Sequence, residues 1–117
     1  MKNVVAEKSF VFAVRIVRAV KVIKEEKREY ELASQLLRSG TSIGANISEG
    51  KYAQSEKDFV SKHKIALKEA NETKYWLRLM NATGILDEKA VASLIDDVDE
   101  LIKLLTSIIN TTQSKMR

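Results

Sequence analysis

The sequence predicts an all-α protein, an up-down-up-down antiparallel four-helix bundle, on three observations. Apolar residues recur with a spacing of three and four almost throughout, and no segment alternates with period two for long enough to form a strand. Four such segments are long and joined by short connections, as in antiparallel bundles. The 117 residues, 44% hydrophobic and 31% charged, fit one globular domain over residues 1–117.

The first predicted helix, about residues 9–27, is apolar on nearly all of its faces. Its core-facing stripe comprises Phe12, Ala13, Ile16, Ala19, Val20 and Ile23. The apolar residues on its remaining faces are Phe10, Val11, Val14, Val17 and Val22. A corner helix of a monomeric bundle buries one face only, so this second set predicts a homo-oligomer.

The second predicted helix, about residues 31–52, contains three of the four glycines of the chain. Helical spacing continues through this segment at Leu36, Leu37, Gly40, Ile43, Gly44 and Ile47. Each glycine inside a helix costs about 1 kcal/mol relative to alanine, so we expect a neighbouring backbone to come close where the Cβ is missing. A loop at residues 39–46 between two short helices is the alternative.

Capping signals delimit the third and fourth predicted helices, about residues 55–82 and 87–112. Ser55 is a suitable N-cap, with Asp58 placed almost as in a capping box. Gly84 is a C-cap signal, and Asp87 is the expected N-cap of the last helix. That helix has a narrow apolar seam formed by Val91, Leu94, Ile95, Val98, Leu101, Ile102, Leu105, Ile108 and Ile109.

A band of basic residues follows the first helix. Residues 1–30 hold eight Lys or Arg against four acids, whereas residues 84–117 hold four against six. The band consists of Lys8, Arg15, Arg18, Lys21, Lys24, Lys27 and Arg28. It can contact nucleic-acid phosphates without reading bases. An ordinary solvated surface and a helix lying on a membrane are the alternatives.

Patterns that would indicate catalysis or metal binding lack the context that they need. Gly40–Gly44 matches the G-x-S-x-G pattern of hydrolases, but that motif requires a strand before Ser42 and a large sheet. Gly44–Lys51 has the wrong spacing for a phosphate-binding loop. Without cysteines or Glu-x-x-His motifs, we expect no catalytic residue, metal or cofactor. His63 is expected at a helix surface or boundary.

Glutamates in small or apolar surroundings indicate ion pairs rather than acid–base chemistry. Glu49, Glu69 and Glu72 need a partner such as Arg38 if they are half-buried.

No stretch approaches the roughly 20 apolar residues of a membrane span. Glu7 and Lys8 interrupt the apolar run that a secretory signal requires, so we expect a cytoplasmic protein.

The most specific pattern is Arg38-Ser39-x-x-Ser42-Ile43-x-x-Asn46-Ile47-x-Glu49-Gly50. It is followed by Asp58-Phe59 and by Ile65-Ala66-Leu67-Lys68-Glu69-Ala70-x-Glu72-Thr73-x-Tyr75-Trp76-Leu77. With Phe10, these motifs resemble, over about residues 8–112, the four-helix-bundle family encoded by intervening sequences of bacterial 23S ribosomal RNA genes.

The resemblance implies an up-down bundle assembled as a homopentamer, without catalytic residues. The chain is also similar to the accessory proteins of diversity-generating retroelements, which engage reverse transcriptase and nucleic acid and are more basic. The residues that match the family's structural motif are Arg38, Ser42, Asn46, Glu49, Gly50, Glu69 and Glu72. Among them, Asn46, Glu49 and Gly50 are expected to fix the contact between the second and third helices.

The expected function is that of a non-enzymatic oligomeric bundle that contacts RNA or a ribonucleoprotein through the basic band. A structural or protein-interaction module without nucleic-acid binding is the alternative. We expect the partners to be further copies of the chain, with neither a membrane nor a small-molecule substrate among them.

Overall fold

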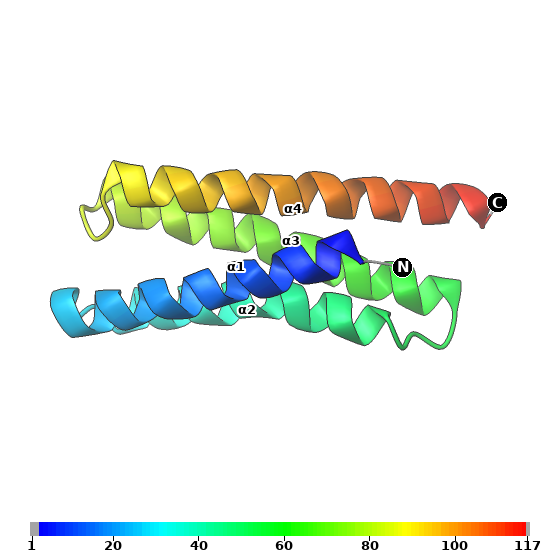
Figure 1. The fold of residues 1–117 in the computed structure, drawn as a ribbon, viewed down its shortest axis with the longest axis horizontal. Helices are drawn as coiled ribbons and strands as arrows, with labels where there is room; N and C mark the ends of the chain where they lie inside the picture. The colour runs from blue at the N-terminus through cyan, green and yellow to red at the C-terminus, as the bar shows by residue number, and fades with distance from the viewer. Residues whose placement is uncertain (1–2, 117) are drawn as a thin grey trace.

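A computed structural model describes residues 3–116 as an antiparallel up-down-up-down bundle (Figure 1). Helix α1 covers Val4–Val22 and continues into a π-helical turn, η1, at Ile23–Lys27. Helices α2, α3 and α4 cover Glu31–Gly50, Glu56–Ala82 and Glu88–Lys115. No strand occurs within the described residues, which confirms the predicted all-α class. None of these helices combines the length and apolarity needed to cross a membrane.

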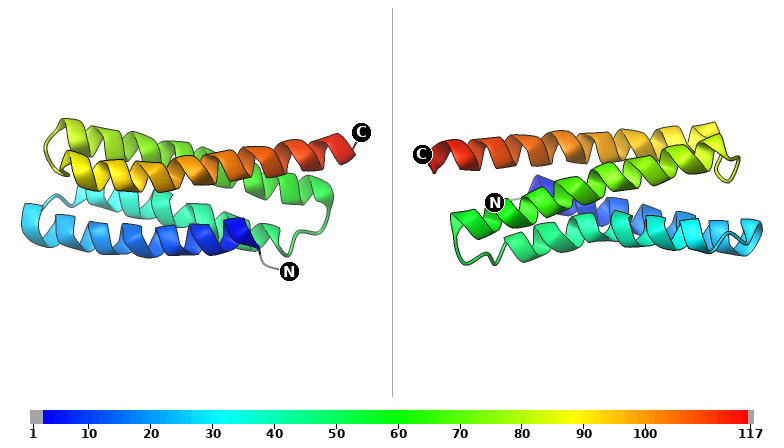
Figure 2. Two further views of the ribbon diagram at one scale, coloured as in Figure 1. Left: turned by 45° about the horizontal axis from the view of Figure 1, so that its top comes forward. Right: turned by 180° about the vertical axis from the view of Figure 1, so that it is seen from behind.

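The helices are arranged so that each packs on two others. The packed pairs are α1–α2, α2–α3, α3–α4 and α1–α4, which leaves α1 and α3 diagonally opposed. The C-terminal end of α4 extends beyond the beginning of α1 (Figures 1 and 2). The bundle measures 49 × 24 × 20 Å, so most side chains lie within one helix layer of solvent.

Side-chain caps explain where the helices begin. Ser55 Oγ accepts the N–H of Asp58 at 3.0 Å, and Asp87 Oδ1 accepts that of Ala90 at 2.8 Å, as predicted for α3 and α4. The predicted start of the first helix at Ser9 is wrong, because Asn3 accepts the Ala6 N–H at 3.1 Å and the helix begins at Val4. The last helix likewise continues past residue 112 to Lys115.

The two interior glycines lie within α2, as predicted, and the alternative of a loop is wrong. A Cβ on Gly40 would lie 2.8 Å from Cγ2 of Ile16 on α1. At Gly44 it would lie 3.2 Å from the Ser9 hydroxyl and 3.5 Å from the Ser9 backbone oxygen. The missing side chains therefore let α1 approach α2, and this contact compensates for the low helix propensity of glycine.

The core contains one buried polar contact between α2 and α3. Thr73 Oγ1 lies 3.0 Å from Ser39 Oγ and also donates to the Glu69 carbonyl at 2.8 Å, and both side chains are fully buried. The surrounding fully buried side chains are apolar and include Phe12, Ile16, Leu36, Ile43, Leu77 and Leu105.

Replacing Thr73 with valine is expected to destabilise the bundle by about 1–2 kcal/mol, because the buried Ser39 oxygen loses its nearest polar partner. Adding Ser39→Ala removes that oxygen, so the double variant should recover most of the loss. Urea unfolding of the wild type, both single variants and the double variant measures the coupling. Strictly additive losses would contradict this account of the pair.

Candidate nucleic-acid interface

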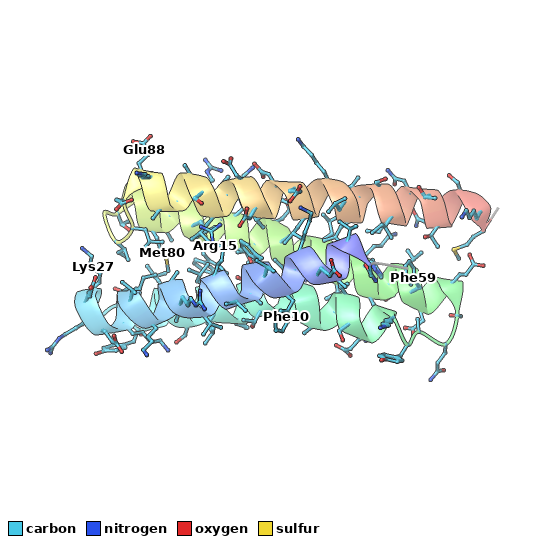
Figure 3. The ribbon with its side chains drawn as sticks, viewed as in Figure 1. Phe10, Arg15, Lys27, Phe59, Met80 and Glu88 are labelled. Carbon is cyan, nitrogen blue, oxygen red and sulfur yellow. The ribbon has the colours of Figure 1, made fainter. Side chains whose placement is uncertain are left out.

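The structure divides the predicted basic band into two parts, of which the first is held against α4. Lys8 Nζ lies 3.0 Å from Glu100 Oε1, and Arg15 pairs with Asp97. The Arg15 guanidinium also donates to Ser93 Oγ at 2.8 Å. Figure 3 shows Arg15 where α1 faces α4. Lys8 and Arg15 therefore form ion pairs between α1 and α4. The sequence pattern alone does not identify their acidic partners on α4.

The second part of the band covers the C-terminal end of α1 and the turn after it. It comprises Arg18, Lys21, Lys24, Lys27 and Arg28. Lys24 is half-buried and the other four are exposed. None of the five forms an ion pair within residues 3–116, although Glu25 and Glu26 lie in the same turn. This part, ending near Lys27 in Figure 3, remains accessible to a polyanion.

The π-helical turn sets the direction of the last cations. Lys24 and Lys27 lie on η1, and Arg28 follows with φ of 53°, in the left-handed region that non-glycine residues rarely adopt. Arg28 therefore ends the helix, and its side chain does not continue the α-helical row.

A polar network joins α2 to α3 at the family-like motif. Arg38 pairs with Glu69, at 3.2 Å, and with Glu72. Glu72 also accepts the Trp76 indole N–H at 3.3 Å. Because Glu69 is only 15% exposed at its side chain, its contact with Arg38 supplies a counter-charge at a position largely removed from water.

The remaining motif residues have different roles along the same pair of helices. Ser42 Oγ donates to the Arg38 carbonyl, and Asn46 donates to the Ser42 carbonyl at 2.8 Å, so both bonds stay within α2. Glu49 reaches across to Lys62 at 3.4 Å. Gly50 approaches α3 closely, since a Cβ there would lie 2.8 Å from His63 Cε1. The side-chain hydrogen bond of Asn46 thus stays within α2 and does not link α2 to α3, whereas Glu49 and Gly50 both contact α3.

His63 is buried, and its expected place at a surface or boundary is wrong. It is 3% exposed and stacks on Phe59 with ring centroids 4.0 Å apart. Its Nδ1 donates to the Phe59 carbonyl at 2.8 Å in the matching tautomer. Gly50 leaves the space that the ring occupies, so the neighbouring glycine was the sequence signal for its burial.

The Gly40–Gly44 pattern does not have the geometry of a nucleophile elbow. Ser42 lies inside α2 and donates to the backbone of its own helix, whereas a nucleophile elbow needs a strand-to-helix turn. Within residues 3–116, no group of three or more His, Cys, Asp or Glu side chains is placed to hold a metal ion.

Helix α1 carries exposed apolar side chains on its outer side. Phe10 is 69% exposed, Val11 59% and Val17 49%. Figure 3 shows Phe10 on the outer side of α1, beside α2. Phe10 lies at the groove between α1 and α2, whereas Val11 lies at the groove between α1 and α4. With the partly exposed Val14 between them, they give the outer side of α1 an apolar character that protein contact surfaces share.

Sequence reasoning missed the lysines on the outer face of α3. Lys57, Lys64 and Lys68 are spaced by seven and four and line the same groove between α3 and α4. Their helical spacing was visible in the sequence, but the predicted nucleic-acid contact was placed on the first helix because that helix has more cations.

The comparisons with known proteins agree with the fold. A crystal structure of a protein of unknown function from the S23 ribosomal protein family of Bacteroides thetaiotaomicron VPI-5482 is 51% identical. The two structures superpose with a TM-score of 0.89, and the match covers 90% of this chain and 97% of the Bacteroides chain. No curated protein matches. The family model described as "23S rRNA-intervening sequence protein" matches residues 1–107. The chain therefore belongs to the family of 23S rRNA-intervening sequence proteins.

Proposed function

We propose that the protein is a non-enzymatic cytoplasmic scaffold that associates with itself through α1 and holds RNA phosphates against the cations at the end of that helix. The observation that carries the proposal is the exposure of three apolar side chains on the outer side of α1, Phe10, Val11 and Val17. Burying such side chains against another copy removes apolar area from water, worth about 25 cal/mol for each Å².

The geometry of α1 favours self-association over a purely solvated surface. Its inner face packs on α2 and on α4, yet Val14 is only partly covered and its neighbours Val11 and Val17 are about half exposed. Arg18 and Lys21 lie one turn after Val14 and Val17, at the border of this surface, and Lys27 and Arg28 follow beyond it. An assembly through the apolar residues would therefore display Lys27 and Arg28 several times. The homopentamer implied by the family resemblance is the proposed form.

An RNA contact is favoured by the accessible cations rather than by the whole predicted band. Arg18, Lys21 and Lys27 are exposed, whereas Lys8 and Arg15 are paired with α4. The structural neighbour is described as a member of a ribosomal protein family, which supports an RNA partner. Repetition in a ring strengthens weak contacts through effective concentration.

Replacing Arg18 and Lys21 with glutamate is expected to weaken the binding of RNAs of different sequence to the same extent, because the protein contacts phosphates and not bases. Fluorescence anisotropy at several salt concentrations is the measurement. Log affinity should fall with log salt by roughly 0.7 to 0.9 per neutralised phosphate, and the variant should show a slope lower by about two.

The matched control is Lys89→Glu/Lys103→Glu, which changes the net charge equally at two exposed positions of α4. Equal losses in both variants would indicate a general charge effect and contradict the α1 contact. No RNA binding by the wild type at low salt would favour the alternative, a protein-interaction module without nucleic acid.

A further inference from the structure

The outer face of α3 bears a cation row on the helix diagonally opposite α1. Lys57, Lys64 and Lys68 line an open groove of about 570 Å³ between the first half of α3 and the end of α4. Its floor is apolar and includes Ile65 and Met116. We call this surface the α3–α4 groove. Because the three lysines follow one helix face, their charges act on the same side of the molecule.

The acids of α3 are directed away from this groove or lie at its end. Glu69 and Glu72 pair with Arg38 of α2, and Asp58 accepts the Gln54 N–H at 3.2 Å beside the N-cap. Glu56 is the first residue of the helix, where a negative charge complements the helix dipole. None of these carboxylates forms an ion pair with the groove lysines.

The groove lysines differ from their neighbours in having no acidic partner. Lys62 pairs with Glu49 and Lys74 with Asp99, so these lysines bind α3 to the adjoining helices. Within residues 3–116, the three groove lysines form no ion pair. The other wall adds no negative charge either, since the sequence has no acid after Glu100. The residues that line the groove thus include three lysines and no acid.

An aromatic side chain extends the row. Tyr75 is seven residues after Lys68, on the same face of α3, and is 57% exposed. Its ring is held edge-to-face against Trp76, with centroids 5.2 Å apart. From Lys57 to Tyr75 the helix rises about 27 Å, at roughly 1.5 Å per residue. A positively charged groove continued by an exposed aromatic ring is the arrangement by which proteins bind single strands.

We infer that the α3–α4 groove binds single-stranded RNA, with Lys57, Lys64 and Lys68 on successive parts of the phosphate backbone and Tyr75 stacked on a base. This site goes beyond the α1 contact of the proposed function and does not depend on it, because the two helices lie on opposite corners of the bundle. The contact is sequence-tolerant, since every base offers a face for stacking.

The test compares two triple variants in binding of a fluorescent 20-nucleotide single-stranded RNA at 50 to 200 mM salt. Lys57→Gln/Lys64→Gln/Lys68→Gln should lower the salt slope by about two, because roughly 0.7 is lost per phosphate on a single strand. Lys21→Gln/Lys24→Gln/Lys27→Gln removes the same charge from α1 and η1. Circular dichroism checks that both variants remain helical.

The outcomes separate the two surfaces. A lower slope for the α3 variant supports the groove, whatever the α1 variant does, provided that Lys89→Gln/Lys103→Gln on α4 keeps the wild-type slope. An equal reduction per charge in that α4 variant would indicate a general charge effect and overturn the groove proposal. A wild-type slope for the α3 variant overturns the groove proposal, and in that case a lower slope for the α1 variant leaves the proposed function standing. Wild-type slopes for both variants overturn both contacts.

A second pair of variants tests the stacking. Tyr75→Ala should weaken RNA binding about tenfold with an unchanged salt slope, because base stacking carries no charge. It should leave the binding of inorganic polyphosphate, which has no bases, unaltered. Tyr52→Ala is the matched control, since Tyr52 is 78% exposed in the connection between α2 and α3. Equal RNA affinity of Tyr75→Ala and wild type would overturn the assignment of Tyr75.

Discussion

Replacing Gly40 with valine is expected to destabilise the bundle by about 3 kcal/mol, at the upper end of the usual cost of overpacking a core. Even the first carbon of a side chain would lie 2.8 Å from Cγ2 and 2.9 Å from Cγ1 of Ile16. Ile16 is fully buried and branches at Cβ, so it cannot move aside without disturbing its neighbours. Urea denaturation gives the free energy of unfolding.

Gly44→Ala is the matched control on the same helix. Its Cβ would meet the Ser9 hydroxyl at 3.2 Å, a contact that a small displacement relieves. The gain in helix propensity, about 1 kcal/mol, should offset this contact, so the control should remain near wild-type stability. Equal stability of Gly40→Val and wild type would show that α1 does not pack on α2 at the distance described.

Replacing both Val11 and Val17 with glutamate is expected to dissociate the proposed oligomer into monomers. The two valines are 59% and 49% exposed in the single chain, and glutamate favours helix, so the bundle itself should stay folded. In an interface between copies, the carboxylates would be buried without partners, which is strongly unfavourable. Sedimentation velocity with parallel circular dichroism distinguishes dissociation from unfolding.

The control is Ile65→Glu, which places a charge at a 39% exposed apolar position on the diagonally opposed helix. It should leave the oligomer intact. An assembly unaffected by the α1 variant but dissociated by Ile65→Glu would place the interface on α3 instead.

Most of the fold followed from local patterns in the sequence. The apolar spacing across Gly40 and Gly44 predicted a continuous helix, and Ser55 and Asp87 capped the helices as expected, because these signals act within a few residues. The start of α1 was missed because the helix is capped by Asn3, whereas Ser9 is buried within the helix and its hydroxyl donates to the Ala6 carbonyl.

The candidate site depended on contacts between helices and was less predictable. Lys8 and Arg15 belong to the basic band by sequence, yet their partners Glu100 and Asp97 lie far along the chain. Within residues 3–116, the groove lysines of α3 can be recognised as unpaired only from the structure, which shows that acids of α3 contact residues outside the groove. Charge counted along a sequence therefore could not separate cations that bind the bundle together from those that remain free.

Sedimentation equilibrium of the wild-type chain at micromolar concentration tests the proposed scaffold most directly. The expected result is a discrete oligomer, five times the 13.2 kDa of one chain in the proposed pentamer. Such an assembly would account for the exposed Phe10, Val11 and Val17. A single species of 13.2 kDa throughout the concentration range would contradict self-association through α1.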